Sequence, residues 1–269
     1  MKMSRKVLVV DNDFFFVEFL AELLENRGYE VIKAYDGKEG LERFDENQFD
    51  LVFCDIIMPK IDGGLFMNII RKRYPDASFP IIALSDLIIE QLGDVKKIKA
   101  DYYIPKGPME EMGKELETLL DRIEKDPLPF QDNEEFFERD NLYPRQASVE
   151  LMESLNFQKS IIESIGVGIT VVDKDAKVIG ANGAALEILK KSMEQVLNNK
   201  IINVFPENCK AKLVQSLKQV IQDQDVKNSA FAFKYKDKNI GVIVSVLRLE
   251  GEIAGWTITM EDTEWAEQA

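Results

Sequence analysis

Histidine is absent from this 269-residue chain, and cysteine occurs only twice. Without histidine, the chain itself lacks the commonest general base, the usual protein ligand of haem and any histidine that could be phosphorylated. The two cysteines, Cys54 and Cys209, lie in unrelated segments without the spacing of a metal site, and we expect both to be buried thiols. Histidine-ligated haem and histidine-based acid-base catalysis are therefore excluded.

Long apolar runs and basic stretches are also missing. No run approaches the roughly 20 apolar residues that a membrane helix needs, and the N-terminus MKMSRKVLVVD passes directly from a basic start into an expected strand. We therefore expect a cytoplasmic protein without a membrane segment. The net charge is −14, and no large part of the chain has an excess of Lys and Arg. This argues against a nucleic-acid partner, because such binding neutralises phosphates with basic side chains.

The chain is long enough for two domains, and its first part has a clear alternation of strands and helices. Short apolar runs bounded by turn residues predict strands at 6–10, 30–34, 51–54, 80–84 and 101–104. Segments with the helical period follow them at 14–28, 37–47, 65–74, 88–99 and 109–125. Five strands alternating with five helices predict an α/β fold with a doubly wound, five-stranded parallel sheet.

Polar side chains stand where several of these strands end. The triplet Asp11-Asn12-Asp13 follows the first strand, Asp55 the third, Ser85 the fourth and Lys106 the fifth. In open α/β sheets the carboxyl ends of the strands meet at one crevice, where ligands bind. Clustered carboxylates repel one another unless a cation joins them, and oxygen ligands of this kind suit Mg²⁺. The sequence therefore predicts a magnesium site at this end of the sheet.

Residues 5–124 resemble the receiver domain of two-component response regulators. The matching pieces are VVDND after the first strand, D-x-x-M-P-x-x-D-G from Asp55, IIALS, and ADYYIPKGP. The resemblance implies a flavodoxin-like fold in which Asp55 accepts a phosphoryl group. It also implies a magnesium site formed by Asp11, Asn12, Asp55 and the carbonyl of Ile57. Ser85 and Lys106 would contact the phosphoryl group. Ser85 and Tyr103 would change conformation when the domain is phosphorylated.

Three features depart from the family pattern. Lys106 is followed by Gly107 and Pro108, where Lys-Pro is usual. Asn12 stands where the family usually has the second acid of a pair, so we expect weaker metal binding. Asp86 stands where the family favours a very small residue, and it adds negative charge beside the expected phosphate entry. These departures leave open a phosphate-independent scaffold, a pseudo-receiver that works without phosphorylation.

Residues 126–150 are acidic, contain three prolines and lack a sustained helical period. We interpret them as a solvated linker, with the alternative that their aromatic residues attach the segment to one of the domains. A helical period then returns. Its apolar positions are Leu151, Met152, Leu155, Ile161, Ile162 and Ile165.

Residues 155–265 resemble a PAS domain. A predicted hairpin at 166–182, a run of helical segments and three longer strands near the end carry the resemblance, together with the closing MEDTEW. It implies an α+β fold with a five-stranded antiparallel sheet, sometimes a small ligand, and often dimerisation through the helix before the first strand. We expect both faces of the strand 239–251 to be covered, with one facing an internal pocket and the other a helix or a partner subunit. The ligand stays unknown.

The complete interpretation is a cytoplasmic two-component response regulator. It has a receiver domain at 1–125, a linker at 126–150 and a PAS domain with its N-terminal helix at 151–269. A histidine kinase or phosphotransfer protein is its expected partner, with a homodimer formed through the PAS helix and no catalytic output domain in this chain. The first alternative is the N-terminal fragment of a larger sensor enzyme, such as a kinase or cyclase. The second is the phosphate-independent scaffold.

Overall fold

The computed structural model describes residues 5–75, 79–85, 99–125, 135–136, 146–222 and 227–263. The chain divides into two compact units, Met1–Ser154 and Leu155–Ala269, which are described separately below. None of the helices in the described ranges is both long and apolar enough to cross a membrane.

The first unit is built on a parallel sheet with the strand order β2-β1-β3-β4-β5-β6. Its strands are β1 (Lys6–Val10), β2 (Glu30–Ala34), β3 (Leu51–Asp55), β4 (Ile81–Ser85), β5 (Tyr102–Pro105) and β6 (Glu135–Phe136). The predicted doubly wound parallel fold is confirmed. The sheet differs from the prediction at one edge, where the two-residue β6 adds a sixth strand from the segment interpreted as a linker.

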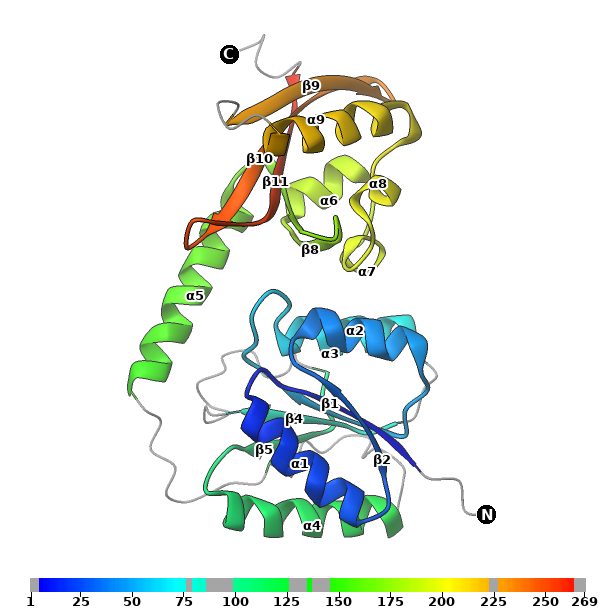
Figure 1. Cartoon of the computed structure of the whole chain (residues 1–269), viewed down its shortest axis with the longest axis vertical. Helices are drawn as coiled ribbons and strands as arrows, with labels where there is room; N and C mark the ends of the chain where they lie inside the picture. The colour runs from blue at the N-terminus through cyan, green and yellow to red at the C-terminus, as the bar shows by residue number, and fades with distance from the viewer. Residues whose placement is uncertain are drawn as a thin grey trace. The chain divides into compact units, whose positions relative to one another are not determined.

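Four described helices cover the two faces of this sheet. Helices α1 (Phe14–Asn26) and α4 (Met109–Lys125) lie on one face, and α2 (Gly37–Glu46) and α3 (Gly63–Arg73) lie on the other (Figure 1). An aspartate at the N-cap accepts backbone hydrogen bonds at the start of α1, α2 and α3, which defines where each helix begins. The helix predicted at 88–99 lies almost entirely outside the described residues.

Helix α3 begins so close to β3 that only glycine fits at its first position. A Cβ atom on Gly63 would lie 1.8 Å from the carbonyl oxygen of Asp55. The Gly63 amide instead donates to the carbonyl of Ile56 at 3.0 Å. The missing side chain thus allows the loop after Asp55 to fold back tightly on the end of the strand.

The second unit is a five-stranded antiparallel sheet with the order β8-β7-β11-β10-β9, as predicted. Helix α5 (Gln146–Ser164) precedes the sheet and begins inside the segment interpreted as a linker. The strands are β7 (Gly168–Asp173), β8 (Val178–Ala181), β9 (Asn228–Tyr235), β10 (Lys238–Leu249) and β11 (Glu252–Asp262). The helical elements between β8 and β9 are α6 (Gly183–Leu189), α7 (Met193–Val196), α8 (Ile201–Val204), η3 (Glu207–Cys209) and α9 (Lys210–Gln222).

The two faces of this sheet differ in burial. Val242 and Val244 of β10 are buried in a core shared with α6, α8 and α9, whereas Ile243 between them is 45% exposed. The alternation along β10 predicted that both faces are covered, the second by a helix or a partner subunit. In the described part of a single chain the second face is open, because the period-2 pattern of a strand shows that a face is apolar but not what covers it.

Asn182 fastens the end of α5 to this core. Its Nδ2 donates to the carbonyls of Ile162 at 3.1 Å and Val167 at 2.9 Å. Its Oδ1 accepts from the amides of Ile169 and Ala185, and only 1% of the residue is exposed. One buried side chain therefore joins the last turn of α5, the start of β7 and the start of α6.

Candidate functional site

Two carboxylates lie side by side where β1 and β3 end. Val10 of β1 pairs with Cys54 of β3, so the next residues along the two strands, Asp11 and Asp55, are neighbours at the same edge. Asp11 is fully buried, and Asp55 is 4% exposed. The Asp11 amide donates to the Ala34 carbonyl, and Asp11 Oδ1 accepts from the Asp13 amide at 2.9 Å. Backbone groups thus hold Asp11 in place through its amide and its Oδ1. Its second carboxylate oxygen, Oδ2, takes no part in these hydrogen bonds.

Lys106 supplies the positive charge of the site. It follows β5, and its amide donates to the carbonyl of Ser85 at 2.7 Å. Its Nζ lies 2.7 Å from Asp11 Oδ2 and 3.3 Å from Asp55 Oδ1, with only 9% of its side chain exposed. The ammonium also lies 4.8 Å from the centre of the Phe16 ring. The ammonium is thus attracted both by the two carboxylates and by the face of the aromatic ring.

The electrostatic balance of the site is negative, because two carboxylates face one ammonium. Burial raises the pKa of Asp11, although the charge of Lys106 and the hydrogen bond from the Asp13 amide oppose this. Asp11 Oδ2 is in ion-pair contact with Lys106 but accepts no hydrogen bond of ordinary geometry. A buried carboxylate oxygen of this kind is suited to a hard cation.

The donor set fits magnesium better than a transition metal. The described residues contain no group of three or more His, Cys, Asp or Glu side chains that could hold a metal ion. Magnesium commonly uses one or two carboxylates and keeps several waters, which Asp11 and Asp55 can satisfy. The partly buried Ile57 follows in the loop after β3, where its carbonyl is the third expected ligand. Asn12 is exposed beside Asp11.

Ser85 and Tyr103 lie on β4 and β5, the two strands that follow β3 in the sheet. Ser85 ends β4 and is 5% exposed, and Tyr103 lies in β5 and is 3% exposed. In the sheet, Asp55 is paired with Leu84, and Ser85 with Pro105. The structure therefore brings Asp11, Asp55 and Lys106 into contact and places Ser85 at the adjoining strand end. Asp86 lies outside the described residues.

Phe16 is a member of the site that sequence reasoning did not identify. The helical period placed it on the buried face of α1, and it is indeed 6% exposed. Nothing in that period indicated that its ring would lie beside the Lys106 ammonium, because the contact joins residues far apart in the chain. Both cysteines are buried as expected, and Cys54 Sγ donates to the Asp55 carbonyl at 3.2 Å.

Exposed aromatic residues lie next to the site at the start of α1. Phe14 is 55% and Phe15 76% exposed, although they follow directly after the Asp11–Asp13 turn. The Phe14 ring stacks on Tyr35, with 5.8 Å between the ring centres. Large exposed apolar side chains grouped in this way are typical of a surface that contacts another protein.

Comparison with known proteins gives matches for both units. The family model of the response regulator receiver domain matches residues 7–117, and that of the PAS fold matches residues 156–263. The uncharacterized transcriptional regulatory protein YcbL of Bacillus subtilis is 33% identical over 104 residues, which are 37% of this chain and 43% of that protein. Response regulator MprA of Mycobacterium sp. is 32% identical over 128 residues, 47% of this chain and 55% of the relative.

The chain thus spans about half the length of the curated relatives it matches. Among solved structures, the response regulator TrrA of Thermotoga maritima, in complex with Mg²⁺ and BeF, is 34% identical with a TM-score of 0.37. That match covers 43% of this chain and 98% of TrrA. Residues 7–117 of the chain form a response regulator receiver domain, and residues 156–263 form a PAS domain that follows it.

Proposed function

We propose that this protein is a two-component response regulator that accepts a phosphoryl group on Asp55. The observation that carries the proposal is the position of Lys106, whose ammonium lies between the buried carboxylates of Asp11 and Asp55. A structural ion pair needs one carboxylate for one ammonium. Two carboxylates around one ammonium instead make a negative site that can take up a cation and then a phosphoryl group.

The residues of the site have distinct roles in this reaction. A carboxylate oxygen of Asp55 attacks the phosphorus of a phosphohistidine, the P–N bond breaks, and the imidazole regains a proton as the acyl phosphate forms. Magnesium held by Asp11, Asp55 and the Ile57 carbonyl would neutralise charge on the transferred group. Lys106 pairs with a phosphoryl oxygen, and the Ser85 hydroxyl donates to another. Tyr103 and Ser85 then change their packing, and the active conformer gains population.

The donor is a histidine kinase or a histidine phosphotransfer protein. This chain has no histidine, so the phosphohistidine must come from another protein. The exposed Phe14 and Phe15 beside the site provide an apolar surface on which such a protein can dock. We place the protein in the cytoplasm. We also propose that it has no nucleic-acid partner, because its net charge of −14 opposes contact with phosphate backbones.

The test of this function uses beryllofluoride, which takes the place of a phosphoryl group on a carboxylate. With magnesium and beryllofluoride, we expect the backbone amide NMR signals of Asp55, Ser85 and Lys106 to shift, and Asp55→Asn to abolish the shift. Unchanged signals in the wild-type protein would favour the phosphate-independent scaffold instead. Magnesium alone serves as the control, because it separates the effect of the metal from that of the phosphoryl mimic.

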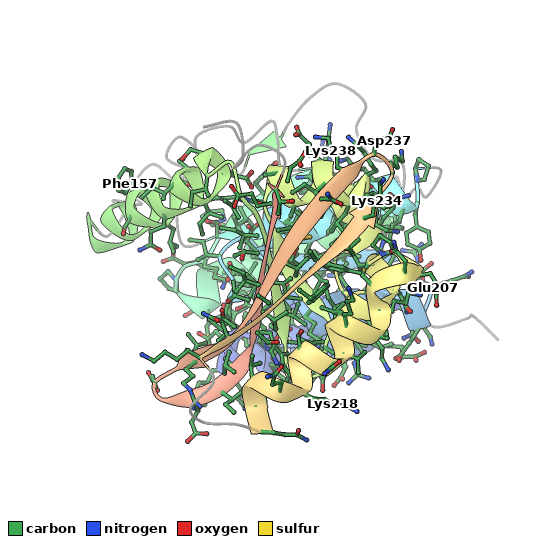
Figure 2. The ribbon with its side chains drawn as sticks, turned by 90° about the horizontal axis from the view of Figure 1, so that it is seen from above. Phe157, Glu207, Lys218, Lys234, Asp237 and Lys238 are labelled. Carbon is green, nitrogen blue, oxygen red and sulfur yellow. The ribbon has the colours of Figure 1, made fainter. Side chains whose placement is uncertain are left out.

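The PAS domain is proposed to hold two copies of the chain together through α5. Three apolar residues of this helix, Leu155, Ile161 and Ile162, are 44% to 45% exposed in a single chain, and Ile165 directly after it is 38% exposed. Phe157, which Figure 2 shows on α5, is 68% exposed. The open sheet face around Ile243 adds further apolar area. A helix that merely connects two domains has no reason to expose so many apolar side chains.

The oligomeric state can be tested by light scattering. We expect a dimer for the wild-type protein at tens of micromolar (a roughly chosen range for weak interfaces) and a monomer for Leu155→Glu combined with Ile161→Glu. Lys159→Glu lies on the same helix and introduces the same side chain at a position that is already polar, so it should leave the dimer intact. A monomeric wild-type protein would contradict dimerisation through α5.

A further inference from the structure

The short strand β6 pairs with β5, the strand that leads to Lys106 of the functional site. Tyr102 and Tyr103 of β5 pair in parallel with Glu135 and Phe136 of β6. On its other side β5 pairs with β4, and just beyond its end Lys106 contacts Asp11 and Asp55. Within the described residues, β6 occupies the edge of the sheet that β5 would otherwise present. A strand edge of this kind readily takes up another extended segment.

The pairing of β6 is small enough to be reversible. Only two residue pairs join β6 to β5. A typical intramolecular hydrogen bond contributes only about 1 kcal/mol net, and strands usually contain at least three residues. A modest change in the position of β5 can therefore shift the population between the paired and unpaired states.

The pairing also shortens the free stretch of chain before α5. Ten residues lead from Phe136 to Gln146 at the start of α5, and they can span at most about 36 Å. Without β6, the connection starts at Lys125 at the end of α4, and its 21 residues can span at most about 76 Å. The end of α4 is itself anchored, because Arg27 forms an ion pair with Asp121 and Tyr29 donates to Glu124.

We infer that β6 is a detachable clamp on the receiver domain, formed by Glu135 and Phe136, which pairs with β5 in the phosphate-free state and separates from it on phosphorylation. The coupling rests on the proposed function. In the described structure, β6 is paired while Lys106 contacts both carboxylates. A phosphoryl group on Asp55 draws Lys106 toward its oxygens and moves the end of β5. The same linkage requires that loss of β6 pairing favours the phosphorylated conformer.

The clamp can be tested without phosphorylation by hydrogen-deuterium exchange. The variant Glu135→Pro with Phe136→Pro removes both backbone donors of β6. We expect the amides of β5 that face β6 to exchange about tenfold faster in this variant. Asn141→Pro introduces proline outside β6 and should leave them unchanged. Equal exchange of β5 in the wild-type and double-proline proteins would overturn the clamp.

The coupling is tested by adding magnesium and beryllofluoride to the full-length wild-type protein. We expect exchange at residues 135–136 to become about tenfold faster, together with shifted amide signals of Asp55 and Ser85. Shifted signals with unchanged exchange would overturn the coupling and leave the proposed function intact. If the signals do not shift, the proposed function fails, while the double-proline comparison still decides whether β6 pairs with β5.

The increase in reach is measured by electron-spin distances between labels on Glu22→Cys and Lys218→Cys, one in each domain. The double-proline variant should give a distribution that extends to longer distances than in the wild-type background, and Asn141→Pro should not. Identical distributions in all three proteins would show that β6 does not limit the distance between the domains.

Discussion

Lys106 lies closer to Asp11 than to Asp55, with its Nζ 2.7 Å from Asp11 Oδ2 and 3.3 Å from Asp55 Oδ1. The ammonium thus lies against Asp11 Oδ2, the oxygen that a metal ion would need. Binding of a cation at Asp11 and the ion pair with Lys106 are therefore competing events. On this account, metal binding also frees the ammonium to pair with a phosphoryl group on Asp55.

The first prediction follows from this competition. Lys106→Met keeps a side chain of similar length but removes the positive charge, so the two carboxylates should attract magnesium more strongly. We expect magnesium to bind at least about tenfold more tightly, a difference of about 1.4 kcal/mol. Isothermal titration calorimetry measures this magnesium affinity. Lys60→Met is the control, because Lys60 pairs with Asp36 and not with the site. Unchanged or weaker affinity for Lys106→Met would show that Lys106 and the metal do not compete.

Asn12 offers a second test of the metal site. It is exposed beside the buried Asp11, at the position where an acid would add a negative charge to the metal site. Asn12→Asp should bind magnesium more tightly than the wild-type protein, because Coulomb attraction offsets part of the cost of removing water from the ion. Equal or weaker affinity would remove position 12 from the surroundings of the metal.

The exposed aromatic residues at the start of α1 predict a difference between protein and small-molecule phosphodonors. Phe15→Ser should slow phosphotransfer from the partner histidine kinase about tenfold, which corresponds to about 1.4 kcal/mol of lost contact energy. Phosphorylation by acetyl phosphate should continue at the wild-type rate, because a small donor needs no docking surface.

Phe157→Ser provides the matched control for this comparison. Phe157 is 68% exposed, similar to the 76% of Phe15, but it lies on α5. It should therefore leave phosphotransfer from the kinase unchanged. If Phe15→Ser slowed both donors equally, its effect would be on the site itself and not on docking.

Tyr29 gives the first domain a predictable response to alkaline pH. Burial, followed by the hydrogen bond to Glu124, raises the pKa of Tyr29 to about 12, whereas an unfolded tyrosine has a pKa of about 10. Because the pKa is raised on folding, the contribution of the neutral phenol is fully present below about pH 10. It is lost as the pH rises toward 12.

The measurement is the free energy of unfolding in urea for the wild-type protein and Tyr29→Phe. At neutral pH the variant should be less stable by about 1 kcal/mol, the usual contribution of one hydrogen bond. The difference should disappear as the pH approaches 12. A constant difference across this range would contradict the raised pKa.

The sequence predicted most of the first domain because its elements carry strong local signals. The run KVLVV matches β1 residue for residue, and an aspartate marks the start of three helices. The meeting of Asp11, Asp55 and Lys106 was predictable as well, since parallel strands bring their carboxyl ends to one edge. The relative distances within the site were not predictable, because nothing in the sequence shows that Lys106 lies nearer Asp11 than Asp55.

The features that the sequence missed depend on tertiary contacts. A two-residue strand such as β6 has no periodicity of its own, and it exists because β5 offers an edge. The four-residue α8 was likewise too short to show a helical period. The exposure of Ile243 could not be read from the alternation of β10, which identifies two apolar faces but not the partner of either.

Phosphorylation of Asp55 is tested most directly by the intact mass of the protein after incubation with acetyl phosphate and magnesium. The account predicts that the wild-type protein gains the mass of one phosphoryl group, which hydroxylamine removes as expected for an acyl phosphate. Asp13→Asn, which keeps the cap of α1, should gain the same mass, and Asp55→Asn should gain none. A wild-type protein that gains no mass, or an Asp55→Asn variant that still does, would contradict the account.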